Sequence, residues 1–185
     1  MSQLFLDVPK DYLENLKYRR ELRYRARRDS RLRAAIRTAC RDDILFWFNA
    51  FCWLNEPRPE KDETGKEKPQ IIPFITWPHQ DPAITATYEK LGYEDVLWNK
   101  TRGEGASWIA VDFCIHDWLF LPLTSIGMVS RNEDCADTPD DLDSLFAKID
   151  WTLTMLPAWM VGEYRRNLTK HTLKNLRNGS MITAY

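Results

Sequence analysis

The first third of the chain has the apolar pattern of two helices. Pro9 suits a first helical turn, where a missing N–H group costs nothing. Residues 42–59 follow as a nearly all-apolar segment that ends at Pro57 and Pro59. In residues 9–41 the apolar side chains fall near helical spacing, at Leu13, Leu16, Tyr24, Leu32 and Ile36. The pattern predicts one helix over 9–41 and a second, core-forming helix over 42–59.

A polar stretch separates these helices from a different pattern. Residues 57–70 contain Gly65 and three prolines, which predicts an exposed loop. Beyond it, strands and helices alternate: strands are expected at 71–77, 94–100 and 123–131, and helices at 78–91, 106–120 and 140–160. Two last strands, about 172–177 and 180–185, would pair around a turn at Asn178 and Gly179. This order predicts an α/β fold with a parallel sheet flanked by helices.

Composition is that of an ordinary globular domain. The 185 residues are 44% hydrophobic and 29% charged, and eight tryptophans raise the aromatic content to 12%. The four cysteines show no C-x-x-C spacing and no metal-like pairing with the three histidines, which favours a reduced environment. No apolar run approaches the ~20 residues of a membrane span, and a signal-peptide core is missing. We therefore expect a soluble, intracellular protein that does not engage a membrane.

Charge is distributed unevenly along the chain. Residues 1–41 hold 12 Lys and Arg against 5 Asp and Glu, whereas the remainder holds 14 against 22. Such an arm favours an acidic partner. Its basic face is formed by Arg19, Arg20, Arg23, Arg27 and Arg28. Two interpretations stay open, a solvated helix surface and contact with nucleic-acid phosphates.

The segment LWNKTRGEGASWIAVDF, residues 97–113, is similar to a phosphate-binding loop whose lysine has moved. The usual loop is G-x-x-x-x-G-K-[ST]. With Gly105 as its second glycine, Ser107 takes the hydroxyl position and Ala106 stands in the lysine's place. Lys100 then occupies the first position. A strand before this loop and a helix after it would direct N–H groups at an anion. The alternative is a glycine-rich turn with a lysine nearby.

The residue types of this loop suit phosphate binding. Gly103 and Gly105 permit the positive φ of an anion-binding turn. Lys100 can reach the phosphates because the loop folds back on itself, and Arg102 is a second candidate cation. Ser107 can bind the Mg²⁺ that the phosphates hold. Glu104 is unfavourable there unless its carboxylate points outward.

An upstream glutamine adds a candidate for the base. Gln80 begins the helix expected at 78–91, some 20 residues before the loop. Its side-chain amide can pair with both edges of adenine, and Trp77 or Tyr88 offers apolar contact. The alternative is an exposed glutamine at a helix N-terminus. Further along, Arg131 either couples the nucleotide to DNA or forms a surface salt bridge with Asp134.

Five segments resemble, in collinear order, the N-terminal ATPase domain of the large terminase subunit of tailed bacteriophages, the DNA-packaging motor. They are DDILFWFNAFCWLNEPR, PFITWPHQDPAI, NKTRGEGASW, MVSRNEDCADTPDDLDSLFAKIDWTLTMLPAWM and LRNGSMI, within residues 40–185. The lysine-first loop and the long SR-x-E-D … SLF-x-KID … LP-x-WM segment are the most specific parts. Some large terminases place the lysine as Lys100 stands here, with an arginine where Arg102 stands.

The resemblance implies ATP and Mg²⁺ as ligands. Lys100 and the backbone amides of 103–107 would contact phosphates, Ser107 would hold the metal, and Gln80 would bind adenine. Lys100 and Arg102 would be the catalytic cations. The implied ATP-binding set is Gln80, Lys100, Thr101, Arg102, Gly103, Glu104, Gly105, Ala106, Ser107 and Trp108.

The resemblance also implies partners and an organisation. The partners would be double-stranded DNA, the portal protein, the small terminase subunit and further copies in a ring. The place would be the host cytoplasm, transiently at the procapsid portal. Residues 1–41 would be a basic helical arm, 42–70 an apolar helix and exposed loop, and 71–185 the N-terminal portion of a P-loop ATPase domain.

A working P-loop ATPase also needs a Walker B strand that ends in Asp, followed by a catalytic Glu. The IAVDF run at 109–113 falls inside the expected loop helix and does not supply them. We therefore expect a split gene, a truncation or a fragment that binds ATP weakly and hardly hydrolyses it. Two rivals remain, a basic-armed DNA-binding or adaptor module without NTPase activity and a different P-loop or helicase-type motor.

Overall fold

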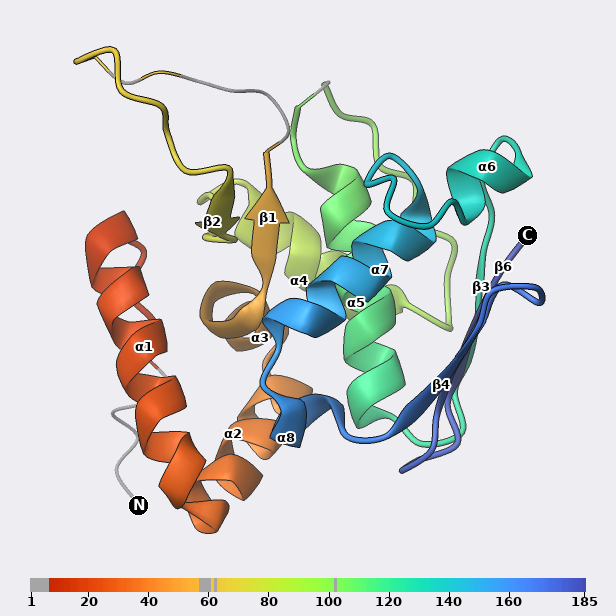
Figure 1. Ribbon diagram of the computed structural model, residues 1–185, viewed down its shortest axis with the longest axis horizontal. Helices are drawn as coiled ribbons and strands as arrows, with labels where there is room; N and C mark the ends of the chain where they lie inside the picture. Colours follow the sequence, from red (N-terminus) through yellow and green to blue (C-terminus); the bar gives the residue numbers. More distant parts are fainter. Residues whose placement is uncertain (1–6, 57–60, 62, 102) are drawn as a thin grey trace.

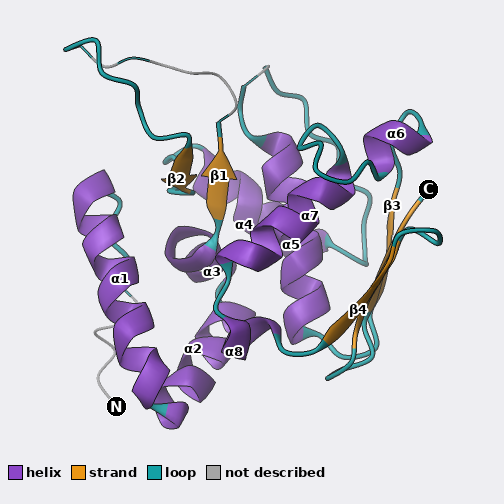
Figure 2. Ribbon diagram, viewed as in Figure 1, coloured by secondary structure: helices purple, strands orange, loops and turns teal. Residues whose placement is uncertain are grey.

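Helices form one side of the molecule and a small sheet forms the other (Figures 1 and 2). The computed structural model describes residues 7–56, 61, 63–101 and 103–185. The helices are α1 (Tyr12–Arg28), α2 (Ser30–Asp42), α3 (Ile44–Phe51), α4 (Gln80–Lys90), α5 (Ala106–Phe120), α6 (Glu133–Ala136), α7 (Leu145–Met155) and α8 (Ala158–Val161). The strands are β1 (Trp53–Asn55), β2 (Ile71–Pro73), β3 (Ser125–Met128), β4 (Tyr164–Asn167), β5 (Thr172–Asn175) and β6 (Met181–Ala184). The chain is therefore α/β, as the sequence predicts.

The four-stranded sheet is mixed, with parallel pairing only between β3 and β6. Its strand order is β3-β6-β5-β4, and the β6–β5 and β5–β4 pairs are antiparallel. Short turns join the last three strands, and such turns permit only antiparallel pairing. The predicted β5–β6 hairpin is confirmed, with Gly179 at a φ of 80°. The strand β4 was not predicted.

The N-terminal arm forms two helices where one was expected. Asp29 separates α1 from α2, and its carboxylate accepts hydrogen bonds from Arg31 N at 2.9 Å and Leu32 N at 3.0 Å. A side chain that caps these free N–H groups stabilises a new helix start. Both helices also contribute to the core, with the buried side chains Leu22, Ala26, Leu32, Ile36 and Cys40.

The apolar segment after residue 42 is helical only as far as Phe51. Asp43 caps α3 by accepting hydrogen bonds from Leu45 N and Phe46 N, both at 2.9 Å. The chain then becomes extended at Cys52 and continues as β1, which pairs antiparallel with β2. The helix predicted over 42–59 is therefore too long.

Aromatic side chains fill one core that joins the arm, the central helices and the sheet. The helix α5 packs against α2 and α7 at the centre of the molecule (Figure 1). Trp47, Phe51, Trp118 and Phe146 are all fully buried. The rings of Trp47 and Phe51 stack with their centroids 6.3 Å apart. Among the helices in the described ranges, none combines the length and apolarity needed to cross a membrane.

Residues 94–100 do not form the strand that the sequence predicts. The indole Nε1 of Trp98 donates to Thr87 Oγ1 at 2.7 Å, which holds this segment against α4. Leu97 is 93% exposed, so the apolar positions do not all enter the core. The loop at 100–105 therefore follows irregular chain, because the expected strand before it is replaced by these contacts to α4.

The helix predicted over 140–160 is divided into α7 and the short α8. Ser144 caps α7 by accepting a hydrogen bond from Ala147 N at 3.2 Å. At the other end Leu156 is extended, with φ −82° and ψ 151°. The ring of Pro157 disfavours the helical conformation for the residue before it, so the chain turns there and resumes as α8.

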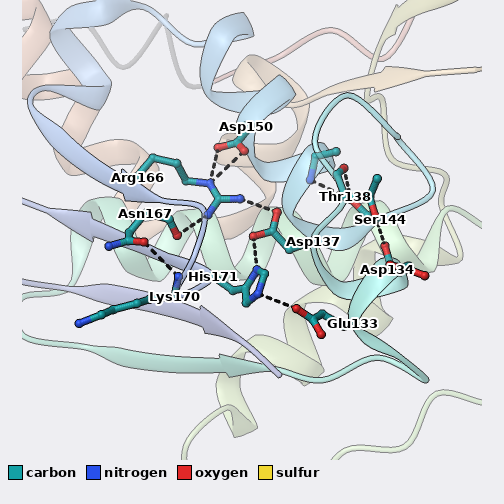
Figure 3. A network of polar contacts seen from close by, with 11 residues as sticks. Glu133, Asp134, Asp137, Thr138, Ser144, Asp150, Arg166, Asn167, Lys170 and His171 are labelled. Atoms are coloured by element: carbon teal, nitrogen blue, oxygen red, sulfur yellow. Dashed lines mark hydrogen bonds and ion pairs between the residues drawn. The ribbon is translucent and has the colours of Figure 1, made fainter.

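A network of charged side chains ties α6 and α7 to the sheet (Figure 3). Arg166 of β4 donates from Nη2 to Asp137 Oδ1 at 2.5 Å and from Nε to Asp150 Oδ2 at 3.0 Å. His171 Nδ1 lies 2.8 Å from Asp137 Oδ2, and its Nε2 lies 3.1 Å from Glu133 Oε1. The hydrogen bond to Asp137 is the largest cause that raises the pKa of His171. The network fixes the β4–β5 turn to α6.

Candidate functional site

The loop before α5 has the backbone conformation that the sequence predicts for an anion-binding turn. Gly103 has φ 94°, and Gly105 has φ 68° and ψ 13°. Gly105 is the N-cap of α5, with no side-chain cap on the helix, and its carbonyl accepts from Ile109 N at 3.0 Å. The first N–H groups of α5 are therefore not used by a capping side chain, which leaves them available to an anion.

A pocket of about 510 Å³ lies between α4 and this loop. It brings together Gln80, which the sequence assigned to the base, and Lys100, which it assigned to the phosphates. Thr101, a further member of the implied ATP-binding set, lines it too. Glu104 also lines it. The pocket has further lining residues that the sequence did not indicate, and these include His79, Thr87, Lys90 and Trp98. Of these four residues, only His79 had a signal in the sequence, because it directly precedes Gln80.

Gln80 is buried and ties the start of α4 to the loop. Its Oε1 accepts from Trp77 N at 2.9 Å, and its Nε2 donates to the main-chain oxygen of Glu104 at 3.2 Å. The side chain is 7% exposed, so the expectation of an exposed helix-terminal glutamine is wrong. Its amide is oriented at the pocket edge by two backbone partners.

The N-terminus of α4 is fixed in turn by polar contacts to α3. Thr76 is buried, its N–H donates to Asn49 Oδ1 at 3.0 Å, and its hydroxyl donates to Asp81 Oδ1 at 2.5 Å. Lys10 forms an ion pair with Asp81 and donates to Thr76 O at 3.1 Å. These bonds hold residues 76–81 in one position, and with them the side chain of Gln80.

The carboxylate of Glu104 points back across the loop, where it contacts Thr101 and His79. Its Oε1 accepts from Thr101 Oγ1 at 3.1 Å, and its Oε2 lies 3.1 Å from His79 Nε2. The contact with His79, followed by that with Thr101, lowers the pKa of Glu104. The loop therefore places one negative charge, that of the Glu104 carboxylate, at the pocket.

Other members of the expected ATP-binding set lie away from the pocket or outside the described residues. Ser107 is exposed in the first turn of α5. Trp108 faces the opposite side, where its ring meets that of Trp151 at 5.2 Å and lies 5.8 Å from Lys148 Nζ. Ala106 lines a second, apolar pocket of about 750 Å³ beside β3. Arg102 falls outside the described residues.

Among the described residues, no group of three or more His, Cys, Asp or Glu side chains is arranged so that it could hold a metal ion. A divalent ion at this loop would depend on the hydroxyl of Ser107 and on phosphate oxygens. The cysteines are free, and burial raises the pKa of the Cys40 and Cys52 thiols.

The basic arm contains two kinds of arginine. Arg19 is 2% exposed and Arg23 is partly buried, where it donates from Nη2 to Met155 O at 2.8 Å. The remaining cations of α1 are exposed and form no ion pair with a described carboxylate: Lys17, Arg20, Arg25, Arg27 and Arg28. The arm therefore both packs on the core and presents unpaired positive charge.

Arg131 does not form the salt bridge with Asp134 that was one of its two expected roles. Its Nε donates to Cys135 Sγ at 3.1 Å, a contact within one turn of chain. Asp134 instead contributes its main-chain oxygen to the hydroxyl of Thr138 at 2.8 Å. Coupling of a nucleotide to DNA by Arg131 stays a prediction.

Comparison with known protein families and curated proteins identified no relative of this chain. No protein-family model matches the chain, and no curated protein is significantly similar to it.

Proposed function

We propose that this chain binds a nucleotide in the pocket between α4 and the loop that precedes α5. One observation carries the proposal: Gln80 and Lys100, chosen from the sequence for opposite ends of a nucleotide, line the same pocket. Its volume of about 510 Å³ lies in the range of small-molecule sites, ~300–1,000 Å³. The positive φ of Gly103 and Gly105 supports an anion at the mouth of α5.

The proposed roles follow from position and chemistry. Lys100 would contribute a point charge to the phosphates, and the first N–H groups of α5, which follow Glu104 in the chain, would supply hydrogen-bond donors to them. Ser107 lies in that helical turn and supplies a hydroxyl for Mg²⁺. Gln80 binds the base after it releases its bond to the Glu104 main chain. Arg102 is proposed as the second cation.

The same proposal assigns the chain to the ATP-binding part of a phage terminase large subunit. Its support is the collinear resemblance of five segments together with the pocket that joins two of them. In the intact motor, ATP would be hydrolysed by attack of water on its γ-phosphate, and this reaction would drive double-stranded DNA into a procapsid. Portal protein, small subunit and further copies of the chain are the partners that this assignment proposes.

Replacing Lys100 by alanine is expected to weaken binding of Mg²⁺-ATP by about tenfold or more, since a charged contact to phosphate contributes ~1.5–3 kcal/mol. Ser107→Ala should weaken binding only when Mg²⁺ is present. Isothermal titration with ATP, with and without Mg²⁺, measures both effects.

Lys174 on β5 provides a matched control, because it is an exposed lysine that does not line the pocket. Lys174→Ala should leave ATP binding unchanged. Equal affinity of the unmodified chain, Lys100→Ala and Ser107→Ala would contradict nucleotide binding at this loop. Strong ATP turnover by this chain that Lys100→Ala abolishes would contradict the expectation of near inactivity.

The unpaired cations of α1 favour a second candidate function, in which the arm binds nucleic acid and the loop is only a turn. Exposed guanidinium groups release condensed counterions when they meet phosphates. Arg20, Arg27 and Arg28 are exposed without a described carboxylate partner, so no internal ion pair must be broken.

Double-stranded DNA is expected to bind this chain with an affinity that falls steeply as salt rises. Replacing Arg20, Arg27 and Arg28 by glutamine should flatten the slope of log K against log[salt] by about 0.9 for each phosphate that an arginine no longer neutralises. Fluorescence anisotropy over a salt series measures the slope, and Arg165→Gln on β4 is the control. Salt-independent binding, or none at low salt, would remove this role and favour protein docking.

A further inference from the structure

We propose that the carboxylate of Glu104 is an internal anion that occupies the hydroxyl donor of Thr101 and the ring nitrogen of His79, and that an anionic ligand must displace it. The inference rests on the proposed function, because it concerns how the same pocket is regulated. It assigns to the loop a closed state, the one observed, and an open state in which phosphate oxygens replace the carboxylate.

The geometry for this exchange is present in the closed loop. Glu104 Oε1 takes the hydrogen bond of Thr101 Oγ1, and Oε2 faces His79 Nε2, both at 3.1 Å. Thr101, His79 and Lys100 line the same pocket as Glu104. A carboxylate oxygen and a phosphate oxygen are equivalent acceptors for such donors. The loop is therefore already in contact with an anion, supplied by its own chain.

Displacement is feasible because these contacts lie close to solvent. The Glu104 side chain is 30% exposed and that of His79 is 63% exposed. Ion pairs in such surroundings contribute little to stability, so a ligand with several charged oxygens can replace them. A retained Glu104 carboxylate would instead repel phosphate at close range.

The same residue connects the two halves of the pocket. Gln80 Nε2 donates to the main-chain oxygen of Glu104 at 3.2 Å. Where the Glu104 main chain moves together with its carboxylate, the Nε2 of Gln80, part of the amide proposed for the base, is freed as well. A ligand that has both a phosphate chain and a base benefits from one opening, whereas a small anion obtains only the phosphate half.

Glu104→Gln removes the charge and preserves size, and Glu104→Ala removes the acceptors as well. Both variants should bind Mg²⁺-ATP and pyrophosphate about three- to tenfold more tightly than the unmodified chain, as the removal of one like charge predicts. Glu89→Gln is the matched control, because Glu89 is an exposed carboxylate on α4 that does not line the pocket. Its affinity should equal that of the unmodified chain.

Hydrogen exchange without ligand tests the closed state separately. Glu104→Ala should accelerate amide exchange over residues 99–106 and leave α5 beyond its first turn unchanged. Unaltered exchange would overturn the internal contact whatever the ligand data show. Faster exchange with unchanged or weaker ATP affinity would overturn displacement while nucleotide binding stands. Absence of ATP and pyrophosphate binding in every variant would overturn the proposed function and the displacement with it.

Discussion

Replacing Arg19 by methionine is expected to lower the free energy of unfolding by about 1.5–3 kcal/mol, because the buried hydrogen bonds of a charged group are lost. Arg19 is 2% exposed, and its guanidinium satisfies four main-chain carbonyls. The Nη1 donates to Cys52 O at 2.8 Å, and Nη2 donates to Asn49 O at 2.6 Å. Longer bonds of 3.3 Å reach Phe48 O and Phe74 O.

These carbonyls explain why the substitution is costly. Phe48 and Asn49 belong to the last turn of α3, where the helix dipole favours a cation. Methionine would fill similar volume and remove these hydrogen bonds from a charged group. Phe48 O, Asn49 O and Cys52 O would keep only their bonds from Cys52 N, Asn15 Nδ2 and Phe74 N. Burial lowers the pKa of Arg19 to about 9, which still keeps the guanidinium charged at neutral pH.

Urea denaturation followed by circular dichroism measures the decrease in stability. Arg19→Lys should also destabilise the chain, since a single ammonium group does not reproduce the planar fork that reaches several carbonyls. Arg20→Met is the control, because Arg20 is the exposed neighbour on the same helix. A decrease below about 1 kcal/mol for Arg19→Met would contradict this role, as that is the range of ordinary surface changes.

Replacing Asp112 by asparagine is expected to stabilise the protein at neutral pH by about 1–3 kcal/mol, since a neutral amide avoids the cost of keeping a buried carboxyl protonated, ~1.4 kcal/mol for each unit by which its pKa is raised. Asp112 lies inside α5 with no exposed surface. Among the described residues no N–H or O–H group donates to its carboxylate, which has only the weak donor of the Cys52 thiol beside it. Burial raises the pKa of Asp112 well above its ordinary value, and the nearby Cys52 thiol and Arg19 charge oppose this only in part.

The sign of the pH dependence follows from the two states. In the unfolded chain Asp112 loses its proton above a pKa of ~3.9, whereas the folded chain retains it to higher pH. Between the pKa of Asp112 in the unfolded chain and its higher pKa in the folded chain, the folded state binds one more proton. The free energy of unfolding therefore falls as pH rises through this range. The difference between Asp112→Asn and the unmodified protein should be near zero at pH 4 and should grow toward pH 7.

Urea titrations at several pH values between 4 and 7.5 test this expectation. Asp95→Asn is the control, because Asp95 is exposed and no hydrogen bond to a described group holds it. A stability difference that is constant over this range would show that Asp112 is ionised in the folded state. A difference that grows toward low pH would show that its carboxylate is stabilised, the opposite of the inference.

The local sequence was a good guide where one residue type settles the conformation. The helix predicted over 106–120 is α5, with the same ends, because Gly105 adopts a left-handed conformation that starts it. Gly179 places the β5–β6 hairpin for the same reason. In both cases the required positive φ is accessible to glycine at little cost, so the signal does not depend on the rest of the fold.

The spacing of apolar residues predicted the wrong element where a side-chain hydrogen bond ends or replaces that element. The helix predicted over 9–41 is interrupted at Asp29, whose carboxylate caps the next helix. The strand predicted at 94–100 is absent because Trp98 bonds to Thr87 on α4. Apolar spacing does not report either contact, since each depends on the partner that the folded chain supplies.

At the candidate site, too, the local sequence indicated some features and the tertiary structure decided others. The sequence alone selected Gln80 and Lys100 and indicated that Gly103 and Gly105 adopt a positive φ. Only the tertiary structure decided that these residues share one pocket, that Glu104 turns back onto Thr101 and His79, and that Gln80 is committed to backbone partners. Backbone preference is a property of a few neighbouring residues, whereas a pocket and its internal contacts depend on segments that meet only when the chain is folded.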